Sequence, residues 1–234
     1  MGFRPAVINM NQLKISGLTY GGRPLGIGAG SSPSYEQWVD LPYEYYLQGN
    51  EQLWMTVNLT GMPQTSDKGY FTMVFDAKIW GSTGGAARIV IQPPGQSQPQ
   101  DWRPSNVYAM WDHFQFSTPP AFFAMEDNVD KTWTTDPGAT QYVTVQSWWG
   151  VFTSLWPENT YKPFKLVCDR ANHTCHVYID GVYLGYVSNF SNDLLTWNII
   201  YLYSDQGRSY EIAAVKNIKI AGFSDLASAR AWEG

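Results

Sequence analysis

Tryptophan side chains are the residues of this 234-residue chain whose type and position best suit ligand binding. The candidates lie in stretches without regular periodicity: Trp102, Trp111, Trp133, Trp148 and Trp149. A flat aromatic ring can stack on the face of a sugar, so these residues predict a glycan-binding platform. The alternative is structural, because large β-proteins also fill their cores and cover their loops with Trp and Tyr.

A second aromatic group has a spacing that suits one face of a helix. Its members fall at i, i+1, i+4, i+7 and i+8: Trp148, Trp149, Phe152, Leu155 and Trp156. If the segment is helical, this stripe would dock against a protein groove or a membrane interface. We favour the alternative, a loop that packs on its own domain, because Gly150 disfavours a helix.

Two cysteines, Cys168 and Cys175, are the only ones in the chain. They fall opposite each other in the hairpin derived below, a spacing that suits a disulfide and would favour an extracytoplasmic or cell-surface location. Two buried thiols in a reducing compartment are the alternative. A metal site that adds His173 and His176 is disfavoured, because strand alternation sends His176 to the face opposite the cysteines. We predict no metal and no cofactor.

Catalytic residues are not indicated by any pattern. Glycosidases need two carboxyl groups flanking the scissile bond, and Asp76 stands alone in its strand while Glu126 and Asp127 fall in a predicted loop. Nucleotide-binding, Gly-x-Ser-x-Gly and His-Glu-x-x-His motifs are absent from the sequence. Acids that are distant in sequence can still meet in space, so catalysis is disfavoured rather than excluded.

The elements that must position these side chains are strands. Two-residue alternation recurs along the chain, with Gly, Pro, Asn and Asp at short intervals, which predicts an all-β fold. One predicted strand has an apolar face made of Leu53, Met55, Val57 and Leu59, and another has Phe71, Met73, Phe75, Ala77 and Ile79. We predict that residues 70–92 form a long-looped hairpin through the glycine-rich run 81–85.

Residues 164–187 allow a register to be worked out. If Cys168 faces Cys175, then Leu166 faces Val177 and Phe164 faces Ile179, so all of these side chains share one apolar face. Asp180-Gly181 is a favoured type I′ turn, and continued pairing would place Val177 opposite Leu184 and Cys175 opposite Tyr186. Residues 197–203 and 210–220 supply two more strands, the second bulged near Lys216-Asn217.

This C-terminal third resembles a known superfamily. The run Phe-Lys-Leu-Val-Cys-Asp, followed by Cys-His-Val-Tyr-Ile-Asp-Gly-Val-Tyr-Leu-Gly and Ala-Ala-Val-Lys-Asn-Ile-Lys-Ile, is similar to the closing half of concanavalin A-like (laminin G-like) jelly rolls. The resemblance implies an antiparallel β-sandwich. That superfamily includes lectins, hydrolases, lyases and adhesion or appendage domains, so the resemblance implies a fold and not an activity.

The chain length and the positions of its proline pairs predict the domain organisation. We predict one β-sandwich over residues 1–234, with residues 93–163 as a loop-rich insertion or decorated region, because Pro93-Pro94, Pro119-Pro120 and Pro137-Gly138 interrupt long aperiodic stretches.

Charge and hydropathy exclude several partners. The net charge is −5 and no basic run occurs, so a nucleic-acid partner is not expected. No apolar stretch is long enough to span a bilayer, and the first residues do not form a signal peptide, although peripheral membrane contact stays open.

These observations predict a non-catalytic binding module, with a glycan bound through the loop aromatics. The alternative is an accessory structural subunit of a virion, appendage or membrane complex, whose aromatic surface contacts protein partners or a membrane. A weaker alternative is a glycoside hydrolase or lyase with dispersed acids.

Overall fold

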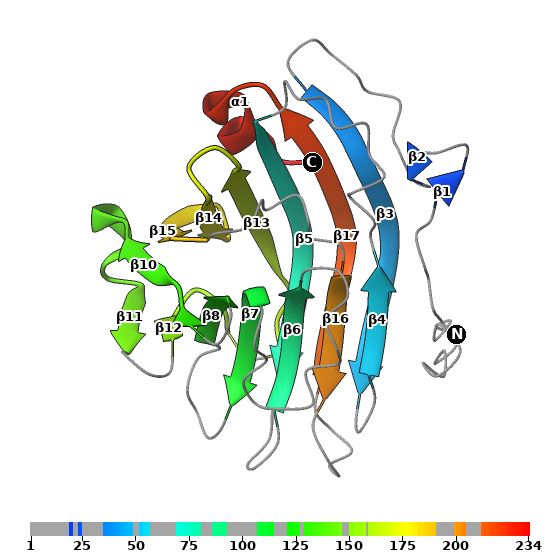
Figure 1. Ribbon diagram of the computed structural model, residues 1–234. Helices are drawn as coiled ribbons and strands as arrows, with labels where there is room; N and C mark the ends of the chain where they lie inside the picture. Colours follow the sequence, from blue (N-terminus) through cyan, green and yellow to red (C-terminus); the bar gives the residue numbers. More distant parts are fainter. Residues whose placement is uncertain are drawn as a thin grey trace.

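The computed structural model describes most of the strand-forming part of the chain. The described residues are 19–20, 23–24, 35–48, 52–56, 69–80, 86–92, 107–114, 121–126, 129–146, 150–157, 159–190, 199–204 and 212–234. They form two large antiparallel sheets that pack as two layers (Figure 1).

The first layer is a seven-stranded sheet. Its strands follow the spatial order β10 (Thr132–Thr135), β15 (Val182–Ser188), β14 (Thr174–Ile179), β13 (Lys162–Asp169), β5 (Tyr70–Trp80), β17 (Ile212–Phe223) and β3 (Tyr35–Gln48).

The second layer is an eight-stranded sheet. Its main path is β11 (Val143–Gln146), β12 (Gly150–Thr153), β8 (Ala121–Glu126), β7 (Val107–Phe114), β6 (Ala86–Gln92), β16 (Ile199–Ser204) and β4 (Gln52–Thr56), with β9 (Val129–Asp130) paired to β8. The smaller elements are a β1–β2 ribbon (Thr19–Tyr20, Arg23–Pro24), a 3₁₀ turn η3 (Pro137–Ala139) and the helix α1 (Leu226–Ala231). The prediction of an all-β antiparallel sandwich is confirmed, while its assignment to the jelly-roll, concanavalin A-like type stays a prediction.

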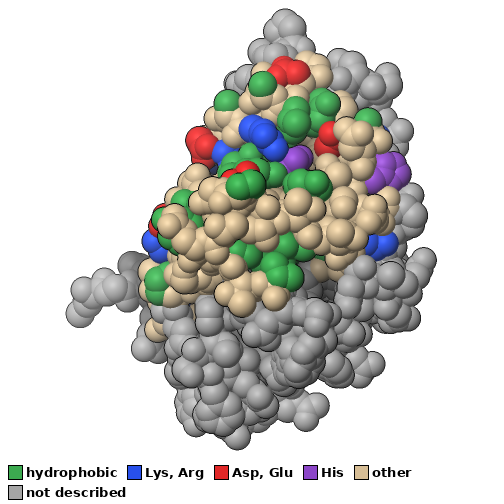
Figure 2. All heavy atoms as spheres, turned by 90° about the vertical axis from the view of Figure 1, so that its left-hand side faces the viewer, with side chains coloured by type: hydrophobic (Ala, Val, Ile, Leu, Met, Phe, Trp, Pro, Cys, Tyr) green, Lys and Arg blue, Asp and Glu red, His purple; other side chains and the backbone are tan. Residues whose placement is uncertain are grey.

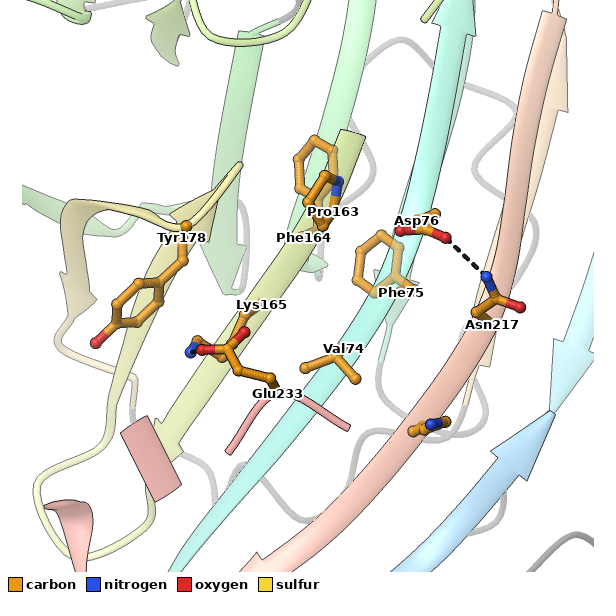
Figure 3. Close-up of a pocket in the computed structure, with 11 residues that line it drawn as sticks. Val74, Phe75, Asp76, Pro163, Phe164, Lys165, Tyr178, Asn217 and Glu233 are labelled. Atoms are coloured by element: carbon orange, nitrogen blue, oxygen red, sulfur yellow. Dashed lines mark hydrogen bonds and ion pairs between the residues drawn. The ribbon is translucent and has the colours of Figure 1, made fainter. Parts of the chain in front are cut away.

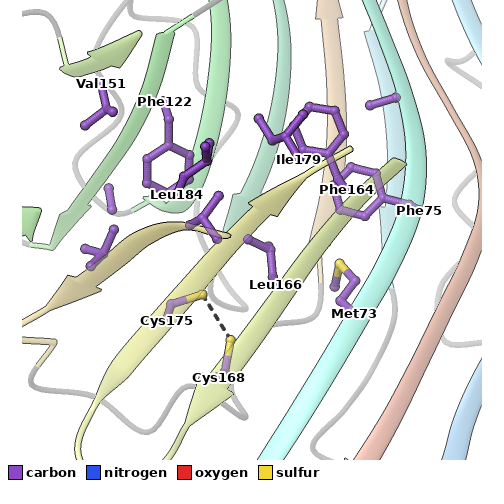
Figure 4. Close-up of a cluster of buried hydrophobic side chains, with 14 of the residues drawn as sticks. Met73, Phe75, Phe122, Val151, Phe164, Leu166, Cys168, Cys175, Ile179 and Leu184 are labelled. Carbon is purple, nitrogen blue, oxygen red and sulfur yellow. Dashed lines mark hydrogen bonds between the residues drawn. The ribbon is translucent and has the colours of Figure 1, made fainter. Parts of the chain in front are cut away.

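The core lies between the two sheets. Phe71, Met73, Phe75, Ala77 and Ile79 are all buried, as the alternation of β5 predicts, and Phe75 stacks on Phe164 of β13 at 5.5 Å between ring centroids. Phe122 and Val151 belong to the same cluster from the eight-stranded sheet (Figure 4). We call the other face of the seven-stranded sheet, turned away from this core, the outer face.

The β13–β14 hairpin has the predicted register. Cys168 faces Cys175, Leu166 faces Val177 and Phe164 faces Ile179. The Asp180-Gly181 turn, which joins β14 to β15, has φ values of 53° and 75°, as a type I′ turn requires.

The predicted register of β14 against β15 holds only beside the turn. Ile179 faces Val182, but a bulge shifts the register beyond Tyr178, so that Val177 faces Gly185 and Cys175 faces Val187. The predicted pairs Val177 with Leu184 and Cys175 with Tyr186 are therefore wrong. The physical reason is burial: the extra residue lets both Leu184 and Val187, three positions apart, point into the core.

The bulge predicted in the closing strand is confirmed. The pairing of β17 with both of its neighbours shifts after Lys216, and Asn217 adopts a left-handed φ of 54°. This shift keeps Val215, Ile218 and Ile220 in the core on both sides of the bulge.

The predicted hairpin over residues 70–92 is wrong. β5 pairs with β13 and β17, whereas β6 pairs with β7 and β16 in the other sheet. The chain crosses from one layer to the other between these strands, because β13 and β17 occupy both edges of β5 and leave none for β6.

Three other predictions can be compared with the strands of the structure. Leu53 and Met55 lie in β4, while Val57 and Leu59 lie outside the described residues. The stretch 93–163, expected to be loop-rich, contributes β7, β8, β11 and β12 to one sheet and β10 to the other. Closing strands were expected over 197–203 and 210–220, and β16 and β17 lie there.

Gly185 provides a stability test of the β15 bulge. Its φ is 141°, and a Cβ built there would lie 2.1 Å from the Thr134 carbonyl oxygen on β10. We expect Gly185→Ala to destabilise the protein by about 3 kcal/mol or more, because the backbone of β10 must move. Urea unfolding measures this loss.

Gly181→Ala is the matched control. It also has a positive φ, 75°, but no described atom lies within 4 Å of the new methyl group, so we expect a cost of about 1 to 2 kcal/mol. Equal losses for the two variants would contradict the proposed clash with β10.

Candidate functional site

A pocket opens on the outer face of the seven-stranded sheet. It lies where β5, β13, β14 and β17 run side by side, has a volume of about 530 Å³ and is bordered by Glu233, which follows α1 (Figure 3). Outward-facing positions of the four strands supply its side chains, among them Val74, Asp76, Lys165, Tyr178 and Lys219. Its size falls within the range of small-molecule sites.

A carboxylate and an amide form one side of this pocket. The Asn217 Nδ2 group donates a hydrogen bond of 2.8 Å to Asp76 Oδ2. Asp76 points outward from β5 by alternation, while Asn217 reaches it because the β17 bulge places this residue in the left-handed conformation, which Asn tolerates well. The pair presents hydrogen-bond donors and acceptors in one place.

An aromatic ring and a charge pair form the opposite side. Lys165 Nζ lies 4.8 Å from the centre of the Tyr178 ring, donates to the Arg230 carbonyl oxygen at 2.8 Å and forms an ion pair with Glu233. In Figure 3 Glu233 and Lys165 lie side by side, while Asp76 stands on β5 and Asn217 beyond it on β17. The pocket therefore brings opposite charges, amide groups and an aromatic ring together.

Two lysines on β5 and β17 lie against another aromatic ring, that of Tyr161. Lys78 Nζ and Lys216 Nζ lie 4.7 and 4.2 Å from the centre of the Tyr161 ring. Lys216 faces Asp76 across the β5–β17 ladder, so these cations lie next to the Asp76–Asn217 pair. Cation–π contacts of this kind fix the Tyr161 ring.

A buried polar cluster fastens α1 to the outer face beside the pocket. Arg230 Nη2 donates to His176 Nδ1 at 3.0 Å, and the Tyr183 hydroxyl lies 2.8 Å from the same nitrogen. A guanidinium group can only donate, so Nδ1 is an acceptor and the imidazole is neutral. Thr72 adds a hydrogen bond of 2.7 Å to the Ala229 carbonyl oxygen, which holds α1 in place.

The electrostatics of this cluster follow from its burial. Desolvation, reinforced by the nearby Arg230 charge, lowers the pKa of His176 to about 4, although Asp169 opposes the shift. Desolvation also raises the pKa of Tyr183 to about 12 and that of Tyr178, with Arg230 acting in the other direction. The cluster is thus held in its uncharged forms around one arginine.

The predicted aromatic platform is only partly within the described residues. Trp102, Trp148 and Trp149 lie outside them, and of Trp111 and Phe152 only the strand positions, in β7 and β12, are described. Trp133 lies in β10, packs against Phe122 with ring centroids 5.6 Å apart and donates to Thr135 Oγ1 at 2.8 Å. None of these described positions lies at the pocket.

Trp156 is a core residue, which corrects its assignment to the binding surface. Its side chain is 1% exposed and meets Phe164 edge-on at 4.5 Å between ring centroids. The helical stripe is also wrong, because residues 150–153 form strand β12, paired with β8 and β11. The alternative that we favoured, a loop that packs on its own domain, is also only partly met, because the segment contains this strand.

The two cysteines lie where the register places them. Both are fully buried thiols, with their Sγ atoms 3.2 Å apart (Figure 4). Burial, with Cys175 nearby, raises the pKa of the Cys168 thiol. The disulfide stays a prediction, which thiol titration of the denatured protein would decide.

The histidines of the same hairpin do not converge with the cysteines. His176 faces outward toward Tyr183, while His173 Nδ1 lies 2.7 Å from the Phe190 carbonyl oxygen. Within the described part of the chain, no three His, Cys, Asp or Glu side chains come together in a way that could hold a metal ion.

Sequence reasoning missed the pocket, although it noted some of its parts. The alternation placed Asp76 on the outward side of its strand, and the shift at Lys216-Asn217 marked the bulge. The combination of the two features is the signal that could have indicated the site. Asp76 is an isolated outward-facing acid on a regular strand, and Asn217 is an outward-facing amide at a bulge.

The pH dependence of stability tests the His176 cluster. Because the folded-state pKa of about 4 lies below the ordinary value of 6.5, stability is full above pH 6.5 and falls as the pH drops toward 4. We expect a loss of roughly 2 kcal/mol over this window after allowing for partial solvent screening.

The measurement is urea unfolding at a series of pH values for the wild type and His176→Gln. The glutamine oxygen can still accept from Arg230 but does not titrate, so the variant should have a shallower profile between pH 6.5 and 4. Parallel profiles would show that His176 does not contribute to the pH dependence.

Comparisons with known proteins give structural neighbours only. No protein-family model matches the chain, and no curated protein does. Among solved structures, galectin LEC-6 of Caenorhabditis elegans matches at 4% identity and a TM-score of 0.42 over 75% of this chain and 94% of its own.

Two further neighbours have similar scores. Sheep galectin-11, in complex with glycerol, matches at 6% identity and a TM-score of 0.41 over 74% of this chain and 98% of its own. The metal-free carbohydrate recognition domain of Emp46p matches at 10% identity and a TM-score of 0.48 over 82% and 89%. The likeness concerns the fold alone.

Proposed function

We propose that this chain is a non-catalytic module that binds a glycan in the pocket on the outer face. The observation that supports the proposal is the Asp76–Asn217 pair across a pocket of about 530 Å³ from the Tyr178 ring. Carboxylate and amide groups exchange hydrogen bonds with sugar hydroxyls, and an aromatic ring can pack against a sugar's C–H face.

Catalysis is the weaker candidate for the same pocket. Two carboxylates, those of Asp76 and Glu233, line it, so the dispersed acids of the sequence do meet at one site. Each already has a partner, however, since Asn217 donates to Asp76 and Lys165 pairs with Glu233. A glycosidase instead needs one carboxylic acid free to give its proton to the leaving oxygen.

Glycan binding through the loop aromatics stays a separate proposal. Its candidates are Trp102, Trp111, Trp133, Trp148 and Trp149. This version predicts that Trp102→Ala or Trp148→Ala weakens binding while pocket variants do not.

No observation among the described residues favours the structural-subunit alternative. Val145, at 55% exposure, is the single large hydrophobic side chain exposed in that part of the chain. On the face in Figure 2 the described hydrophobic and tyrosine side chains form small patches between polar atoms. The helix α1 is short, and no helix of the described part has the length and apolar character to cross a bilayer.

Substitution of the pocket pair tests the proposed site. We expect Asp76→Ala and Asn217→Gly each to weaken glycan binding about tenfold, since each removes hydrogen bonds to the ligand, and glycine keeps the left-handed φ of residue 217. Glycan-array screening followed by affinity electrophoresis gives the measurement.

Thr144→Ala is the control, because Thr144 is exposed on β11 of the other sheet. Unchanged binding in both pocket variants, with loss in Trp148→Ala, would move the site to the loop aromatics. Absence of binding to any glycan would overturn the proposal, and release of reducing sugar would replace it with the hydrolase.

A further inference from the structure

Lys165 is a buried cation in the wall of the pocket. Its side chain is 8% exposed, although it belongs to the outer face of β13. The Tyr178 ring lies against the ammonium group at 4.8 Å, and the Arg230 carbonyl oxygen accepts one of its protons at 2.8 Å. Burying an ammonium group is costly unless an anion accompanies it, so the identity of that anion matters.

The anion is a carboxylate that solvent can reach. Glu233 forms the ion pair with Lys165, yet its own side chain is 74% exposed. It belongs to the segment after α1, outside any strand or helix. Because the Glu233 carboxylate stays largely in solvent, it loses little on leaving the ion pair, so another carboxylate can take its place at low cost.

A second lysine extends the basic side of the pocket. Lys219 of β17 lines the pocket, and neither an ion pair nor a hydrogen bond joins it to another described side chain. A Cβ built on Gly234 would lie 2.9 Å from Val74 Cγ2 and 3.7 Å from Lys219 Nζ, so the segment that contains Glu233 lies between the two lysines. Asp76 stands on β5, between the strands of the two lysines, and points toward Asn217 (Figure 3).

We infer that the pocket takes a sugar that carries a carboxylate group, that Lys165 is its anchor, and that Glu233 occupies the anchor until the ligand displaces it. The inference rests on the proposed function and adds the substrate class. The Asp76–Asn217 pair would bind hydroxyl groups, because a ligand carboxylate would be repelled by Asp76. A neutral glycan would leave the Lys165–Glu233 pair in place and gain nothing from it.

The experiment uses glycan pairs that differ only in the carboxylate. Suitable probes are sialylated glycans beside their desialylated forms, and glucuronate oligomers beside glucose oligomers of the same linkage. The wild type should prefer the acidic member. Lys165→Met should weaken binding of that member about ten- to a hundredfold, as loss of a charge-assisted hydrogen bond does, and weaken the neutral member far less, so that the preference for the acidic member is lost.

Lys162→Met is the matched control. Lys162 lies on the same strand but pairs with Asp180 at its end, and it does not line the pocket. This variant should retain the preference for the acidic member, so a loss in both lysine variants would indicate general charge attraction and overturn the inference.

Glu233→Gln tests the displacement even if Lys165→Met fails to fold. Removal of the competing carboxylate should tighten binding of the acidic member about two- to fivefold, because Glu233 is itself largely exposed and competes only weakly. Unchanged affinity would overturn the inference. If the acidic and neutral members bind equally, and Asp76→Ala abolishes binding of both, the inference is overturned but the proposed function stands. If neither member binds, both the inference and the proposed function are overturned.

Discussion

Burial of the inner face of β5, β13 and β14 against the second sheet is the constraint on which the rest of this structure depends. The Phe75–Phe164 stack and the edge contact of Trp156 lie at its centre, and the paired cysteines fill its end. Once these inner positions are fixed, strand alternation sends every second side chain to the outer face. The pocket is made of those side chains, so its composition is a consequence of the core.

Two bulges modify this alternation, and both stand beside the outer-face chemistry. The bulge in β17 gives Asn217 a left-handed backbone and brings its amide to Asp76. The bulge in β15 lets Leu184 and Val187 both enter the core, while Tyr183 remains outside against His176. In each case the apolar residues stay in the core, and the extra residue changes which side chains lie on the outer face.

The helix α1 completes the site from the end of the described chain. Its contacts include apolar packing of Ala229 on the sheet, the hydrogen bond from Thr72 to the Ala229 carbonyl oxygen and the contact of Arg230 with His176. Because His176 is neutral, it accepts from Arg230 without repulsion, and the helix stays on the sheet. The position of Glu233 beside Lys165 follows from this attachment, so the polar cluster and the pocket form one unit.

The sequence by itself determined what neighbouring segments do. Alternation was enough to pair Cys168 with Cys175, because the short connection between β13 and β14 leaves few registers that bury the same face. Only the tertiary structure decided the rest: that β5 and β6 separate into different sheets, that Trp156 is buried, and that Asp76 meets Asn217 across 141 residues. Alternation says which side chains point inward and which outward, but the partner of each strand depends on how the whole chain closes its core.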